Sequence, residues 1–132
     1  AVIGLDTNVL VRYIAQDDSR QSAQAGKLIE SFTQEAPGFV SLVTLAETVW
    51  VLEDVYATRR EQIARIVETL LQTQTLVVQT PELVWQALRG FEASKADFAD
   101  HLVERSGAAA GCTATVTFDK AAARGAGMQL MA

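Results

Sequence analysis

Apolar positions along the chain alternate between short runs rich in β-branched residues and longer stretches with helical spacing. Residues 2–5 form a run of the first kind, which predicts a strand buried on both faces. Residues 9–15 follow with helical spacing, behind the N-cap residues Asp6, Thr7 and Asn8. The opening segment therefore predicts a strand, a carboxylate and a helix, in that order.

The same alternation continues to the end of the chain. Strands separated by helices need right-handed crossovers, so the pattern predicts an α/β fold with a mostly parallel sheet of about five short strands. Helices on both faces would make this a three-layer α/β/α sandwich, formed by residues 1–132 as a single domain. Further strands are predicted at 39–41, 75–79, 113–118 and 128–131, and further helices at 19–35, 43–56, 58–71, 80–91, 97–110 and 120–124.

Composition limits the class of protein. Of the 132 residues, 49% are apolar and 20% charged, which is typical of a globular domain and excludes disorder. Cys112 is the only cysteine, so no intramolecular disulfide can form and a reducing, cytoplasmic location is favoured. No apolar run approaches the roughly 20 residues that span a bilayer, and we expect no membrane association. The net charge of -5 argues against nucleic-acid binding by bulk electrostatics. This argument is weaker if some of the carboxylates hold metal ions.

Two of the 16 acidic residues stand directly after apolar strand segments. Asp6 follows Val-Ile-Gly-Leu and Asp119 follows Thr-Val-Thr-Phe. Parallel sheets bind ligands at the carboxyl ends of their strands, so these carboxylates would meet if the two strands were neighbours.

Two further acids lie within apolar helical stretches. Glu47 shares a helical ridge with Val43 and Trp50, so we expect its side chain to point toward the core. Asp100 lies among apolar residues and shares a helical face with Asp97.

Carboxylates that converge on one sheet edge repel one another unless a cation neutralises them. Oxygen ligands without clustered His or Cys favour Mg²⁺ or Mn²⁺ over zinc. Such an ion can ionise a bound water and stabilise a phosphodiester during in-line displacement. The pattern therefore suggests a metal-dependent phosphodiesterase or nuclease.

Structural roles are the alternatives for each acid. Asp6 and Asp119 could each only cap a helix, and Asp97 could be an N-cap. Glu47 could be the partner in a structural ion pair.

The remaining candidates are weighed in the same way. His101, the single histidine, would point away from the face of Asp100 and is expected to be structural, while Cys112 is expected in the core. Arg12 and Lys120 are close in sequence to the acids and are candidate contacts for substrate phosphates.

Four acidic segments together resemble a known family. The motifs Asp-Thr-Asn-Val-Leu-Val-Arg at 6–12, Leu-Ala-Glu at 45–47, Asp-Phe-Ala-Asp at 97–100 and Thr-Phe-Asp at 117–119 are similar to those of PIN-domain ribonucleases. The likeness is greatest to the VapC-type toxins of bacterial toxin-antitoxin pairs. It implies RNA cleavage that depends on Mg²⁺ or Mn²⁺, a homodimer, and inhibition by a small antitoxin protein.

The resemblance also implies a role for individual residues. The catalytic and metal-binding acids would be Asp6, Glu47, Asp100 and Asp119, with Asp97 as an auxiliary ligand and Thr117 and Asn8 lining the pocket. His101 departs from the pattern, because a small residue is expected there.

Two other classes of function remain open. A phospho-aspartate receiver also places acids at strand ends, but its late lysine and central aspartate are missing, since the middle strands end in Ser41 and Gln79. A catalytically silent PIN-like scaffold that only binds a partner would keep the fold without turnover.

Overall fold

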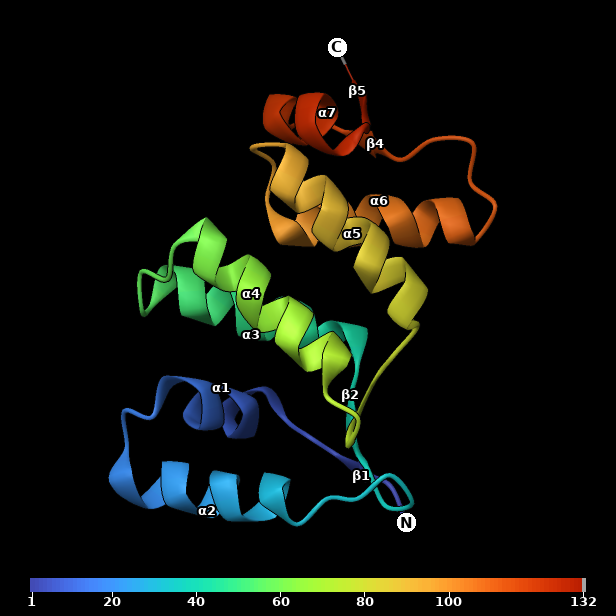
Figure 1. Ribbon diagram of the computed structural model, residues 1–132. Helices are drawn as coiled ribbons and strands as arrows, with labels where there is room; N and C mark the ends of the chain where they lie inside the picture. Colours follow the sequence, from blue (N-terminus) through green and yellow to red (C-terminus); the bar gives the residue numbers. More distant parts are fainter. Residues whose placement is uncertain (132) are drawn as a thin grey trace. The chain divides into compact units, whose positions relative to one another are not determined.

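A computed structural model describes residues 1–131 (Figure 1), and the chain divides into two compact units, residues 1–79 and residues from 80 onward. The first unit contains β1 (Ile3–Gly4), α1 (Thr7–Ala15), α2 (Ser19–Glu30), β2 (Gly38–Val40), α3 (Leu42–Asp54), α4 (Arg60–Gln72) and β3 (Leu76–Val78). The second unit contains α5 (Pro81–Ala93), α6 (Phe98–Ala109), β4 (Val116–Thr117), α7 (Lys120–Ala126) and β5 (Gln129–Leu130).

The strands pair in parallel, as the alternation of strands and helices predicts. In the first unit the order is β1-β2-β3, with Gly38 of β2 opposite both Ile3 and Leu76. In the second unit β4 pairs with β5. The mixed α/β class with parallel strands is therefore confirmed, and the five strands of the described residues form one three-stranded and one two-stranded sheet.

Burial of the first strand was predicted wrongly. Ile3 in β1 is 47% exposed, and Val2 before it is 60% exposed, whereas Leu5 beyond the strand is buried. The run of apolar residues indicates a strand, but a run without alternation does not show which of its faces is covered.

Helix α3 turns a different face to the core from the one predicted. Its buried side chains are Thr44, Leu45, Thr48, Val49 and Leu52, while Val43 and Trp50 are 70% and 60% exposed. Glu47, on the same ridge as these two, is exposed as well. The helix is apolar on nearly all sides, so its periodicity did not identify the buried face.

Aromatic, aliphatic and small residues form the core of the second unit. Phe91 of α5 and Phe98 of α6 are fully buried and meet edge to face, with ring centroids 5.8 Å apart. A separate cluster under α7 consists of Ala96, Ala122, Ala126 and Met128. Cys112, expected in the core, is exposed.

Local signals set some element boundaries but not others. Gly127 ends α7 with a φ of 73°, a left-handed conformation that favours glycine. The predicted helix 19–35 is shorter, because α2 ends at Glu30 before a non-helical stretch, and the strand predicted at 113–118 is only the two residues of β4.

Candidate acidic site

Asp6 is the N-cap of α1. Its Oδ1 accepts a hydrogen bond from the backbone N–H of Thr7 at 2.7 Å, with an extended backbone at the cap. The capping alternative therefore holds for this residue. Its Oδ2 makes no hydrogen bond within residues 1–131, so one carboxylate oxygen is available to a ligand.

Glu47 is linked to the residue that follows Asp6. The Thr7 hydroxyl donates a hydrogen bond to Glu47 Oε1 at 2.8 Å and thereby joins α1 to α3. A pocket of about 380 Å³ opens here, lined by Asp6, Thr7, Asn8, Val11, Arg12, Glu47, Val51, Val55 and Tyr56. The structure thus brings together four residues that the sequence singled out as site candidates. It adds Thr7, which the sequence indicated only as a residue at the helix start, and Tyr56, which the sequence did not indicate.

Asp100 lies near two other acids of the second unit. Partial burial is the main cause that raises the pKa of Asp100, followed by the negative charge of Asp97. The charge of Asp119 raises it further, whereas a hydrogen bond from the backbone N–H of Asp97 and the nearby His101 act in the opposite direction. Asp97 and Asp119 are therefore both close enough to Asp100 to disfavour its negative charge.

Asp119 caps α7. Its Oδ1 accepts hydrogen bonds from the backbone N–H groups of Ala121 at 2.7 Å and Ala122 at 3.2 Å. The Thr117 hydroxyl accepts from the Asp119 N–H at 3.0 Å and so shapes the approach to the helix. Lys120 follows as the first, exposed residue of α7.

Asp97 occupies the N-cap position of α6 without acting as a side-chain cap. Its backbone is extended, but its side chain accepts no capping hydrogen bond. Asp100 stands three residues later, in the first turn of the helix. The Asp97 carboxylate is therefore not engaged in capping the start of α6.

His101 has a structural environment, as expected from its position on α6. The side chain is 5% exposed, and its Nε2 lies 2.8 Å from the Ser94 hydroxyl. Ser94 also accepts from the backbone N–H of Ala96. This contact joins the end of α5 to the helix that carries Asp100.

The donor chemistry fits Mg²⁺ or Mn²⁺. Carboxylate oxygens are the ligands that these ions prefer, and Asp6 and Asp119 each keep one oxygen beyond the capping bond. A cation bound beside Asp100 would offset the negative charges of Asp97 and Asp119 that act on it. Within residues 1–131, however, no three His, Cys, Asp or Glu side chains are grouped closely enough to hold an ion.

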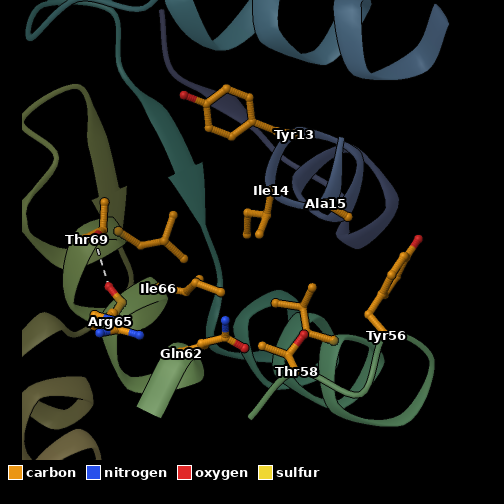
Figure 2. Close-up of a pocket in the computed structure, with 11 residues that line it drawn as sticks. Tyr13, Ile14, Ala15, Tyr56, Thr58, Gln62, Arg65, Ile66 and Thr69 are labelled. Atoms are coloured by element: carbon orange, nitrogen blue, oxygen red, sulfur yellow. Dashed lines mark hydrogen bonds between the residues drawn. The ribbon is translucent and has the colours of Figure 1, made fainter. Parts of the chain in front are cut away.

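A second pocket in the first unit has a different character. It measures about 560 Å³ and is mainly apolar, with Ile14 of α1 and Ile66 of α4 among its lining residues (Figure 2). Tyr56 lies at its edge and lines the acidic pocket as well. None of the predicted acids lines it.

Parallel strands followed by acids at helix starts define an α/β protein with an acidic candidate site. The family model of the PIN domain matches residues 3–128, and the chain belongs to this family. PIN domains are generally nucleases that act on nucleic acid and use divalent metal ions. No curated protein and no solved structure matches the chain. Within residues 1–131, no helix has the length and apolar character needed to cross a membrane.

Proposed function

We propose that this chain is a ribonuclease that hydrolyses RNA phosphodiester bonds and depends on Mg²⁺ or Mn²⁺. The observation that carries the proposal is the pocket that Asp6 and Glu47 line together in a chain of the PIN family. Two carboxylates at one pocket, joined through Thr7, form the start of an oxygen-donor set for a hard cation.

The proposed catalytic residues are Asp6, Glu47, Asp100 and Asp119, with Asp97 as an auxiliary metal ligand and Asn8 and Thr117 as further auxiliary residues. When bound, the ion ionises a water molecule and stabilises the charge that builds on the phosphate. Thr7 fixes Glu47 Oε1, and the capping bonds fix one oxygen each of Asp6 and Asp119. Pre-set carboxylates need less reorganisation when substrate and metal arrive. Lys120 is a proposed contact for RNA phosphates.

The biological setting is part of the same proposal. The motif resemblance supports a toxin of a type II toxin-antitoxin pair that acts in the cytoplasm as a homodimer and is held inactive by a cognate antitoxin protein. The match to residues 3–128 includes residues of both compact units, which supports treating the chain as one PIN domain.

The test is cleavage of pooled cellular RNA with Mg²⁺ or Mn²⁺ and with EDTA. Wild type is compared with Asp100→Asn and with Glu104→Gln. The second variant removes a carboxylate of the same helix, one that forms an ion pair with Arg105. We expect cleavage that needs the cation, is lost in Asp100→Asn, and stays within about twofold in Glu104→Gln.

Other results would point elsewhere. Equal cleavage by wild type and Asp100→Asn contradicts the assigned site and indicates a contaminating nuclease. Absence of cleavage together with absence of Mn²⁺ binding in a titration favours the alternative, a silent scaffold that only binds a partner. Cation binding without cleavage of pooled RNA leads to a search among individual RNA species.

A further inference from the structure

The guanidinium of Arg12 is held by side chains from distant parts of the first unit. Its Nη1 donates to both Asp17 oxygens at 3.2 and 3.3 Å and to the Tyr56 hydroxyl at 3.1 Å. The Tyr56 hydroxyl in turn donates to Asp17 Oδ2 at 2.5 Å. On the other side, Arg12 Nε donates to Gln21 at 2.7 Å. Two sides of the guanidinium are therefore fixed.

The Arg12 Nη2 group is left out of this network. Within residues 1–131 it makes no hydrogen bond or ion pair, and the Arg12 side chain is 32% exposed. With Nε and Nη1 engaged, the N–H groups of Nη2 remain to donate a charge-assisted hydrogen bond to a phosphate oxygen.

The network around Arg12 lies beside the acidic pocket. Arg12 and Tyr56 line the pocket that contains Asp6 and Glu47, whereas Asp17 lies outside its lining. Arg12 is the only cation in that lining. A positive group beside two proposed metal ligands is suited to a phosphate of the same RNA strand, next to the one that is cleaved.

The backbone on both sides of the network is in an uncommon conformation. Gln16, just before Asp17, has a φ of 55°, and Ala57, just after Tyr56, has a φ of 52°. Neither residue is glycine, and such conformations persist where the surrounding structure requires them, often at functional sites. Asp17 therefore follows the left-handed C-cap of α1, and Tyr56 directly precedes a second residue with a left-handed backbone.

We infer that Arg12 binds an RNA phosphate at the acidic pocket, and that Tyr56 and Asp17 are positioning residues that set the direction of its guanidinium. This inference rests on the proposed ribonuclease function and goes beyond it, since neither positioning residue was indicated by the sequence. The network also keeps one protonation state at neutral pH. The hydrogen bond to Asp17 raises the pKa of Tyr56, and the hydrogen bond from Tyr56 lowers the pKa of Asp17.

The test measures binding of a mixed-sequence, fluorescein-labelled single-stranded RNA by anisotropy across a salt series. Ca²⁺ replaces Mg²⁺, and a gel verifies that the RNA stays intact. Arg12→Gln is compared with Arg105→Gln, because Arg105 is also ion-paired and is 36% exposed but lies on α6, outside this pocket. Thermal melting checks that each variant is folded.

We expect Arg12→Gln to weaken binding about tenfold and to reduce the slope of log Kd against log salt by about 0.7, the value for one phosphate contact on a single strand. Arg105→Gln should keep the Kd within about twofold of wild type and leave the salt slope unchanged. Arg12→Lys keeps the charge but loses the planar fork, so it should keep the salt slope and weaken binding by a smaller factor.

The positioning role has its own variants. Tyr56→Phe leaves net charge unchanged and should weaken binding about threefold with an unchanged salt slope. Asp17→Ala should weaken binding although it removes a negative charge, whereas Asp17→Asn, which keeps one of the two acceptor oxygens, should restore part of the lost affinity.

The outcomes distinguish the phosphate-binding role of Arg12, the positioning roles of Tyr56 and Asp17, and the ribonuclease proposal itself. If wild type binds RNA and Arg12→Gln behaves like Arg105→Gln, the inference is wrong while the ribonuclease proposal stands. If Arg12→Gln binds RNA more weakly than wild type but Tyr56→Phe and Asp17→Ala bind as wild type, Arg12 binds phosphate without positioning residues. If wild type neither binds nor cleaves RNA, the proposed function is wrong and the inference falls with it.

Discussion

Gly90 in α5 provides a sharp test of how the second unit is packed. A Cβ added to Gly90 would lie 2.5 Å from Nδ1 and 2.8 Å from Cε1 of His101. The His101 ring cannot turn away freely, because it is buried and its Nε2 contacts the Ser94 hydroxyl. The ring or the α5–α6 spacing must therefore shift if Gly90 becomes alanine.

Two opposing terms set the size of the effect. Alanine in a helix interior is favoured over glycine by about 0.5–1 kcal/mol. Overpacking a well-packed core costs about 1–3 kcal/mol. We therefore expect Gly90→Ala to lower the free energy of unfolding by about 1–2 kcal/mol. Gly26→Ala in α2 is the matched control, since a Cβ there meets nothing within 4 Å, and it should raise the free energy of unfolding by about 0.5–1 kcal/mol.

The assay is urea unfolding followed by far-UV circular dichroism, extended to a double-mutant cycle with His101→Ala. Removal of the ring takes away the clash, so Gly90→Ala should become stabilising in that background, by about 0.5–1 kcal/mol. The reasoning is refuted if Gly90→Ala changes stability by the same amount in both backgrounds, or if it stabilises the wild type as Gly26→Ala does.

Three other predictions concern single side chains. Asp119→Asn should keep the α7 cap, whereas Asp119→Ala should lose about 0.5–2 kcal/mol of stability, measured by urea unfolding. Both variants should abolish RNA cleavage. Cleavage retained in Asp119→Asn contradicts a ligand role for this residue. Because burial and then Asp97 raise the pKa of Asp100, its contribution to stability is present below the ordinary carboxyl pKa and lost as pH rises through the raised value. Metal-free Asp100→Asn should thus melt above wild type at neutral pH, with the difference fading in acid; a lower melting temperature at neutral pH argues against this. Thr48→Val should stabilise by about 1 kcal/mol in urea unfolding, because Thr48 Oγ1 is buried without a hydrogen bond in the described chain, and a loss of stability would indicate an unseen partner.

Local signals explain most of what the sequence could predict. Ser41 caps α3 through the Thr44 N–H, and Gly127 ends α7, so both boundaries depend on residues a few positions apart. The face that a helix buries is not local information. In α3 an exposed Trp50 and a buried Thr48 are two positions apart, and only packing against other elements distinguishes them.

The site shows the same division. Each acid could be found in the sequence because it stands among apolar residues, but the contacts between them depend on the fold. Tyr56 and Asp17 are 39 residues apart, and Tyr56 and Arg12 are 44 apart. No periodicity links positions at such separations, so the network that holds the guanidinium became visible only in three dimensions.

Capping and metal binding are compatible roles for Asp6 and Asp119. An N-cap uses one carboxylate oxygen to accept backbone N–H groups, and the second oxygen retains its own lone pairs. The capping bond also fixes the orientation of that second oxygen at the start of a helix. A neutral asparagine satisfies the helix equally well but lacks the negative charge that a divalent cation needs. Stability therefore reports the capping role and cleavage the ligand role, and the two can be measured separately at the same position.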